Sequence, residues 1–233
     1  IMKHSVRFFR NVVANVAIVA VVAVLSFIGF SGGVVTANAD VKPIYKGGAT
    51  DKVSLMFNVY WGTEYLDKIL DELDEHGVKT TFFVGGSWVR DNEDMFKKIV
   101  ERGHEIGNHG FFHRDHAKLD RDKNREEIEA CHKLVKSVSG VEMNLFAPPS
   151  GAFSRKTLDI AEEMGYTTVM WSKDTIDWRD KNEDLIYTRA TKNVSGGDLI
   201  LMHPTEATAN TLCKVLCTLK ERGLTVATVS EVL

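Results

Sequence analysis

The sequence has few cysteines, no excess of positive charge and no glycine-rich dinucleotide fingerprint. Its three cysteines, Cys131, Cys213 and Cys217, are an odd number without the spacing of a known metal motif, so no disulfide framework is indicated. Cys213 and Cys217 lie four residues apart on a predicted helix, where a buried structural role is expected. The formal net charge of −3 argues against binding to nucleic acid, because such proteins carry a basic surface.

The N-terminal segment combines basic residues with a long apolar run. Lys3, Arg7 and Arg10 precede the apolar run at 11–30, and the small residues of "TANAD" follow it, ending at Asp40. This order is typical of a secretory signal peptide. The run is also nearly long enough to span a bilayer, so an uncleaved membrane anchor is the alternative. Both alternatives predict that the rest of the chain is exported to the extracellular face of the membrane or the cell wall.

The remainder of the chain is predicted to be one domain. Its length and the 44% hydrophobic composition are sufficient for one sizeable core. We place the signal peptide or anchor at 1–40, a linker at 41–51 and the domain at 52–233.

One pattern recurs along the domain. An amphipathic helix ends at a glycine, and a short strand-like run follows within a few residues. Glycine after a helix supplies the left-handed conformation of the C′ position, and the hydrophobic period changes there from helical to strand-like. The pattern occurs at 64–85, 94–109, 154–172, 185–203 and 211–229, with further strands predicted at 53–59 and 143–147.

Alternating helices and short apolar strands indicate a parallel sheet covered by helices. About seven strands can be counted, which suits either a barrel or an open, doubly wound sheet. Because no dinucleotide fingerprint follows the first strand, we favour the barrel. The predicted fold class is therefore α/β, a barrel of about seven parallel strands preceded by the N-terminal hydrophobic segment.

Polar and aromatic residues gather where the predicted strands end. In parallel α/β folds, active sites form at the carboxyl ends of the strands. These ends read "FNVYWG", "GNHGFFH", "FAPPSG", "WSKDTIDW" and "LILMHPT", whereas the opposite ends are plain glycine turns. The asymmetry predicts a site built from Asn58, Tyr60, Trp61, His109, His113, Asp174, Asp177, Trp178 and His203.

The spacing of these residues resembles that of the polysaccharide deacetylases, carbohydrate esterases that share the NodB homology domain. "HGFFH" is similar to the H-x-x-x-H metal motif, "FAPPSG" to the R-x-P-x-G turn, "DTIDW" to D-x-x-D-W and "LMH" to L-x-H, all in family order. "FNVYWG" resembles the F-D-x-x-W-G form of the sporulation-associated branch. The resemblance covers 52–233 and implies a deformed (β/α) barrel of NodB type, with a divalent ion, often zinc.

The resemblance also implies roles for individual residues. His109 and His113 would be metal ligands, His203 the general acid, and the backbone N–H of Ser150 part of the oxyanion site. Asp174 belongs to the D-x-x-D-W segment of the catalytic machinery. The substrate-binding positions would be Trp61, Trp178, Leu201 and Pro149, with the two tryptophans as sugar-stacking surfaces. The implied substrate is an N-acetylated cell-wall glycan, peptidoglycan or chitin-like.

Three positions depart from the family pattern. Asn58 stands where the base aspartate is expected, Val59 where the metal aspartate is expected, and Ala147 where an arginine is expected. The amide of Asn58 cannot accept a proton as a general base. Val59 offers no ligand atom, so a site of two histidines should bind metal weakly unless Asp115 or His116 joins it.

Two functions from different classes therefore remain open. One is a hydrolase in which a metal-activated water attacks the N-acetyl carbonyl, with impaired activity. The other is a non-catalytic, glycan-binding pseudoenzyme of the cell wall or spore envelope. Asn58, Val59 and Ala147 favour the second, whereas the intact His109, His113 and His203 favour the first. The residues themselves also allow a plainer interpretation, in which the histidines are structural and Asp174 and Asp177 cap a loop.

Overall fold

All strand pairs in the computed structural model, which describes residues 40–233, are parallel. The sheet order is β5-β4-β3-β2-β1-β7-β6, and β8 pairs with the start of β1. The expected α/β fold with a deformed barrel of about seven parallel strands is confirmed. The strands are β1 (Lys52–Val59), β2 (Thr81–Val84), β3 (Glu105–Asn108), β4 (Leu145–Phe146), β5 (Thr167–Thr168), β6 (Lys173–Asp174), β7 (Leu199–Met202) and β8 (Thr225–Val226).

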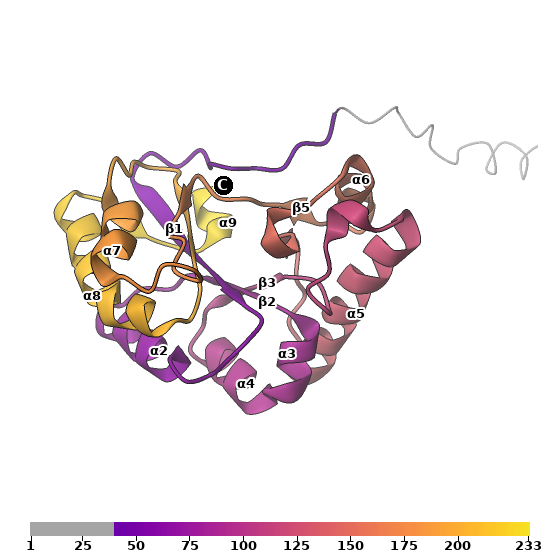
Figure 1. The fold of residues 1–233 in the computed structure, drawn as a ribbon, viewed down its shortest axis with the longest axis horizontal. Coiled ribbons are helices and arrows are strands. Elements are labelled where there is room, and N and C mark those ends of the chain that lie inside the picture. The colour runs from indigo at the N-terminus through magenta and orange to yellow at the C-terminus, as the bar shows by residue number, and fades with distance from the viewer. Residues whose placement is uncertain (1–39) are drawn as a thin grey trace, which may run out of the picture. The chain divides into compact units, whose positions relative to one another are not determined.

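Helices cover the outside of this sheet (Figure 1). Helix α2 shows why they form where the sequence predicts, because its buried residues Leu66, Ile69, Leu70 and Leu73 fall on one helical stripe. The helices are α2 (Leu66–Glu75), α3 (Gly86–Asp91), α4 (Glu93–Glu101), α5 (Arg121–Ser139), α6 (Arg155–Glu163), α7 (Glu183–Thr191), α8 (Glu206–Glu221) and α9 (Val229–Val232), with 3-10 turns at His116–Lys118 and Pro149–Gly151.

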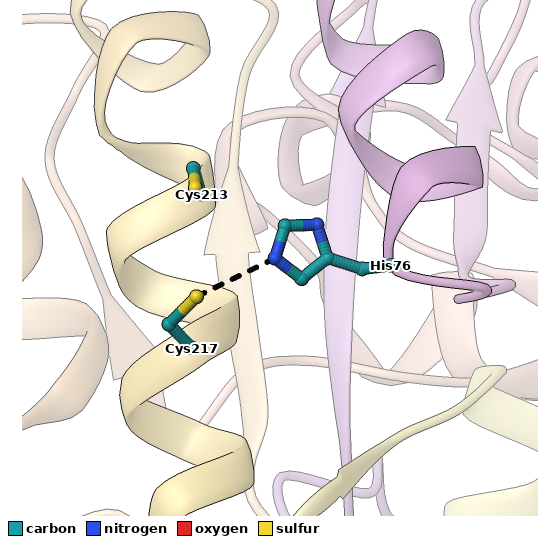
Figure 2. Close-up of side chains that lie close together, drawn as sticks. All are labelled: His76, Cys213 and Cys217. Carbon is teal, nitrogen blue, oxygen red and sulfur yellow. Dashed lines mark hydrogen bonds between the residues drawn. The ribbon is translucent and has the colours of Figure 1, made fainter.

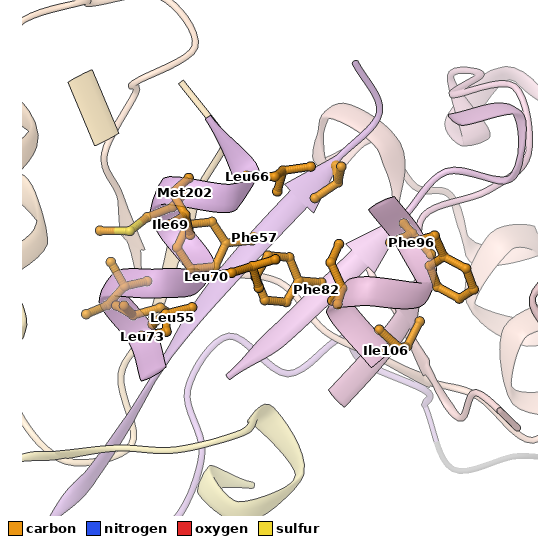
Figure 3. Packing of buried hydrophobic residues seen from close by; sticks show 14 of the residues in the cluster. Leu55, Phe57, Leu66, Ile69, Leu70, Leu73, Phe82, Phe96, Ile106 and Met202 are labelled. Atoms are coloured by element: carbon orange, nitrogen blue, oxygen red, sulfur yellow. The ribbon is translucent and has the colours of Figure 1, made fainter. Parts of the chain in front are cut away.

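Two apolar clusters occupy the two faces of the sheet, as the alternation of side chains along a strand requires. The outer cluster joins strands to helices, and Phe57 and Phe82 stack within it with ring centroids 5.0 Å apart (Figure 3). The inner cluster includes Met56, Phe83 and Leu199. Helix α9 contributes Val229 and Val232 to the inner cluster and so closes the barrel interior.

Residues 41–51, for which a linker is predicted, contact the sheet. Ile44 forms a parallel bridge with Val169, and Lys46 forms an antiparallel bridge with Asp198. The Gly47 N–H donates to the carbonyl of Gly197 at 2.8 Å. These contacts lie between β5 and β7. Within residues 40–233, no strand pairing joins β5 directly to β6, and the segment lies along that opening of the sheet. A domain boundary at residue 52 stays a prediction.

The predicted signal peptide or anchor falls almost wholly at 1–39, outside the described residues. Among the helices of residues 40–233, none combines the length and apolar character needed to cross a bilayer.

Candidate functional site

A cavity of about 440 Å³ lies at the carboxyl ends of the strands. It collects side chains from five strand ends that are far apart in the sequence, which is where the sequence predicts the site. Of the site residues predicted from the sequence, Tyr60, Pro149 and Asp177 are not among the lining residues, and Pro149 and Asp177 are buried. The cavity is lined by Asn58, Trp61, His109, His113, Ser150, Trp171, Asp174, Trp178, Leu201 and His203.

His109 is fixed in one tautomer by the strand beside it. Its Nδ1 lies 2.7 Å from the carbonyl oxygen of Ala147, so Nδ1–H donates and Nε2 keeps its lone pair. Burial lowers the pKa of His109 well below its ordinary value, and His113 lowers that pKa further. The ring is therefore neutral, which is the form that binds metal.

His113 completes an imidazole pair at the end of β3. Its ring meets the ring of His109 edge-on, with centroids 5.1 Å apart, and stacks on Tyr60 at 4.5 Å. Burial is the main cause of its lowered pKa. The backbone of His113 has φ 54°, a left-handed conformation that is uncommon for a residue other than glycine and is often associated with functional sites. Ser150 in the cavity wall shares this conformation, with φ 55°.

A buried glutamate on α5 holds the loop that carries His113. The Glu127 carboxylate accepts hydrogen bonds from the backbone N–H groups of Phe111 (2.9 Å) and Phe112 (2.7 Å). It also lies 3.2 Å from the guanidinium of Arg114. The sequence analysis missed Glu127, although a carboxylate beside Ile128 on the inward face of an amphipathic helix is a detectable signal.

His203 is oriented by Asp177. The ring Nδ1–H donates to Asp177 Oδ1 at 2.7 Å, while Oδ2 accepts from the His203 backbone N–H (2.7 Å) and from the Thr208 hydroxyl (2.6 Å). Asp177 is fully buried. Trp61 stacks on the His203 ring with centroids 5.3 Å apart. The His203 side chain lines the cavity, and Nε2 is its ring nitrogen that does not contact Asp177.

Asp174 has a different partner. Its Oδ1 accepts a hydrogen bond from the Ile176 backbone N–H at 2.8 Å, in a turn where Ile176 has φ 54°. Asp174 lines the cavity but does not orient His203. The family resemblance assigns the catalytic role in "DTIDW" to Asp174, and that role stays a prediction. The contacts show that Asp177, which received no catalytic role, is the residue that positions the histidine.

The three residues that depart from the family pattern are all buried. Asn58 is buried, and its Oδ1 has no hydrogen-bond partner within the described part of the chain. Val59 is fully buried and packs in the outer cluster, on the helix side of the sheet. Ala147 packs in the inner cluster.

The donor set does not form a three-ligand metal site. Asp115 pairs with Lys118 at 2.9 Å. His116 Nδ1 bonds to the Asn124 side chain at 2.8 Å, and its Nε2 is buried without a hydrogen-bond partner in the described part of the chain. Across residues 40–233, however, no third histidine, cysteine or carboxylate atom gathers with His109 and His113 as closely as a metal site requires. Among these residues, the two imidazoles would be the only protein ligands of an ion at this position.

Comparison with known proteins identifies the family. The family model for polysaccharide deacetylase matches residues 46–169. The chain belongs to the polysaccharide deacetylase family. Within that family, the chain is 43% identical over 194 residues to YlxY of Bacillus subtilis (strain 168), covering 82% of this chain and 60% of YlxY. It therefore spans less than two thirds of that relative.

Relatives with described activities and structures include both an enzyme and a pseudoenzyme. Peptidoglycan-N-acetylmuramic acid deacetylase PdaA of B. subtilis is 31% identical over 81% of this chain and 74% of its own length. A crystal structure of a CE4 family pseudoenzyme from Bacillus anthracis has a TM-score of 0.81 and 36% identity, covering 83% of this chain and 69% of that one. A mutant of that pseudoenzyme with restored enzymatic activity has also been solved.

Proposed function

We propose that this protein binds N-acetylated cell-wall glycan, peptidoglycan in the first instance, without deacetylating it efficiently. The observation that carries the proposal is Asn58, a neutral amide with an unpartnered, buried oxygen at the position of the base. Since an amide cannot take a proton from water, residue 58 cannot activate the nucleophile as the aspartate expected there would. Losing a positioned base typically costs about 10²–10⁴-fold in rate.

The surface around the cavity supports glycan binding. Trp61 and Trp178 are 44% and 53% exposed, which is unusual for large apolar side chains, and flat indole faces suit stacking on sugar rings. A second hollow of about 470 Å³ shares both tryptophans with the cavity. Two adjoining hollows separated by aromatic side chains suit a polymeric ligand that extends beyond one sugar. The peptidoglycan deacetylases among the relatives support the choice of glycan.

A weak deacetylase is the second candidate, favoured by the retained His109, His113 and the His203–Asp177 pair. His203 is held so that Nδ1 donates to Asp177, which leaves Nε2 as the atom that would carry a proton to a departing nitrogen. A divalent ion, zinc in the first instance, would have to be held by His109 and His113 alone. The pseudoenzyme relative from B. anthracis favours the non-catalytic alternative.

Export to the cell surface is part of the proposal. It is supported by the basic, apolar and small-residue order of residues 2–39 and by the cell-wall substrates named for the relatives. A cleaved signal and a membrane anchor would both place the cavity outside the membrane.

The deciding experiment measures binding and turnover on the same glycan. The full chain should co-sediment with N-acetylated peptidoglycan while releasing acetate at least about 10²-fold more slowly than an active family member. Replacing Trp61 and Trp178 by alanine should abolish co-sedimentation, whereas Trp88→Phe, at a buried position away from the cavity, should leave it. Acetate release at the rate of an active family member would overturn the proposal, as would failure of the native chain to bind.

A further inference from the structure

A second group of metal-binding side chains lies on the surface, outside the cavity. His76 follows the last turn of α2, and Cys213 and Cys217 lie on the exposed side of α8 that faces His76 (Figure 2). One ligand atom from each residue can be chosen so that all three lie within 4.8 Å of one another. The two cysteines are exposed, so the buried role expected from the sequence is wrong.

The sulfur–nitrogen distance between Cys217 and His76 fits a tetrahedral zinc site. With Zn–S bonds of about 2.3 Å and Zn–N bonds of about 2.1 Å, tetrahedral sulfur and nitrogen ligands lie about 3.6 Å apart, and two sulfurs about 3.8 Å. The Cys217 Sγ lies 3.5 Å from His76 Nε2. The outer limit of 4.8 Å for the cluster exceeds the tetrahedral sulfur–sulfur edge by about 1 Å, which rotation of one exposed thiol can close.

The two helices hold these three side chains close together without a bound metal ion. Residues four apart on a helix share one face, so Cys213 and Cys217 point to the same side of α8. His76 Nδ1 lies 3.0 Å from the Glu72 carbonyl oxygen and 3.2 Å from Glu72 Oε1. Nδ1–H is therefore engaged within α2, and Nε2 is left facing Cys217, as in zinc sites where a second partner orients the ligating histidine.

Glu72 orients the histidine of this cluster. Its Oε1 lies 3.2 Å from His76 Nδ1, so the carboxylate contacts the ring nitrogen that does not face Cys217. Among the described residues, Glu72 does not belong to the group whose ligand atoms lie within 4.8 Å of one another. Its role is that of a partner that orients a ligating histidine.

We propose that His76, Cys213 and Cys217 bind one zinc ion that links α2 to α8. Two sulfur ligands and an imidazole select zinc over magnesium or calcium, which prefer oxygen. Because α2 runs from the carboxyl end of β1 back toward the amino end of β2, His76 lies at the opposite end of the barrel from the cavity. The site is therefore separate from the cavity, and it does not depend on the proposed glycan binding.

The test uses the full chain carrying His109→Ala and His113→Ala, so that the cavity pair contributes no bound metal. Under a thiol-free reductant, we expect about one zinc per chain after dialysis. Cobalt should replace it and give the near-ultraviolet charge-transfer absorption of thiolate-bound cobalt, which imidazole ligands alone do not produce. Cys213→Ser, Cys217→Ser or His76→Ala should remove that absorption. Lys220→Ser, at an exposed position of α8, should retain it.

A second measurement avoids the variants altogether. In the parent chain, zinc should slow alkylation of Cys213 and Cys217 at least tenfold, while the buried Cys131 stays unreactive with or without zinc and serves as the internal control. Cobalt binding without thiolate absorption, or equal alkylation rates with and without zinc, would overturn the proposal. So would a Cys213–Cys217 disulfide that persists under the reductant. Loss of glycan binding would not bear on it.

Discussion

Asp177 holds His203 by both the side chain and the backbone. One carboxylate oxygen accepts from the ring Nδ1–H at 2.7 Å, and the other accepts from the backbone N–H of the same residue at 2.7 Å. The carboxylate therefore fixes both the tautomer of the ring and its direction. The same cavity is lined by Asn58, a neutral amide at the position predicted for the base, so an oriented histidine stands opposite a position without a carboxylate.

Replacing Asp177 by asparagine should change the tautomer of His203. An amide nitrogen facing Nδ1 would favour the ring form that accepts there, and the change at a fully buried position should lower the free energy of unfolding by about 1–3 kcal/mol. Nitrogen chemical shifts of the His203 ring report the tautomer. Asp174→Asn is the matched control and should leave those shifts unchanged. The reverse pattern would show that Asp174 is the positioning residue.

Replacing the three departing residues together by those of the family pattern should give deacetylation. The variant carries Asn58→Asp, Val59→Asp and Ala147→Arg, in a chain that also carries Cys213→Ser and Cys217→Ser so that bound zinc reports the cavity alone. We expect zinc retention near one equivalent and acetate release from peptidoglycan at least about 10²-fold above the parent. A variant that folds and binds zinc but remains inert would show that the catalytic roles are wrongly assigned.

Val59→Asp alone should destabilise the protein unless metal is present. The native valine is fully buried in the outer apolar cluster, so an aspartate there places a carboxylate among apolar groups. We expect the free energy of unfolding to fall by about 2–4 kcal/mol in chelator. Excess zinc should recover part of this loss by drawing the carboxylate toward the histidines. Equal loss with and without zinc would mean that residue 59 cannot reach the ion.

Removing Glu127 should loosen the loop that carries His113. Glu127→Ala leaves the Phe111 and Phe112 amides without their acceptor, so we expect a loss of about 1–3 kcal/mol in stability and faster hydrogen exchange at these two amides. Glu126→Ala is the control, because Glu126 is exposed and pairs only with Lys123, a surface ion pair worth about 0–1 kcal/mol. Similar effects of the two changes would contradict the positioning role.

Stability should fall in mild acid because of buried histidines, of which His104 is the clearest. Burial is the largest cause that lowers the pKa of His104 to about 4, with smaller effects from Lys79 and Arg102 that Asp74 partly opposes. Between pH 6.5 and about 4 the unfolded chain binds a proton that the folded chain does not. The stability present above pH 6.5 is therefore lost as the pH falls through this window, by up to about 3 kcal/mol.

His104→Asn should flatten this dependence, because an amide oxygen can still accept from the Thr80 N–H in place of Nδ1. Urea unfolding at intervals from pH 7.5 to 4.5 would measure the difference between the two chains. Parallel curves would show that His104 does not titrate as its burial requires.

The elements of the fold follow from local sequence patterns, and the contacts of the site do not. Helices α2, α4, α6 and α8 end close to their predicted glycines, whereas α7 ends at Thr191, before Gly196. The strand-end residues meet in one cavity because parallel strands bring their carboxyl ends together. The choice of Asp177 over Asp174 depends on the path of a turn with a left-handed Ile176, which no local pattern specifies. The nearness of His76 to Cys217 joins residues 141 positions apart, so spacing alone could not reveal it.

The segment 41–51 has a practical consequence for any shortened form of this protein. Ile44, Lys46 and Gly47 bond on one side to the end of β5 and on the other to the start of β7, so they cover backbone groups at the free edge of β5 and just before β7. A chain cut at residue 52 would expose these backbone groups and the apolar side of Val169. Uncovered strand edges pair with other chains, so such a fragment should aggregate where one beginning at residue 41 stays monodisperse.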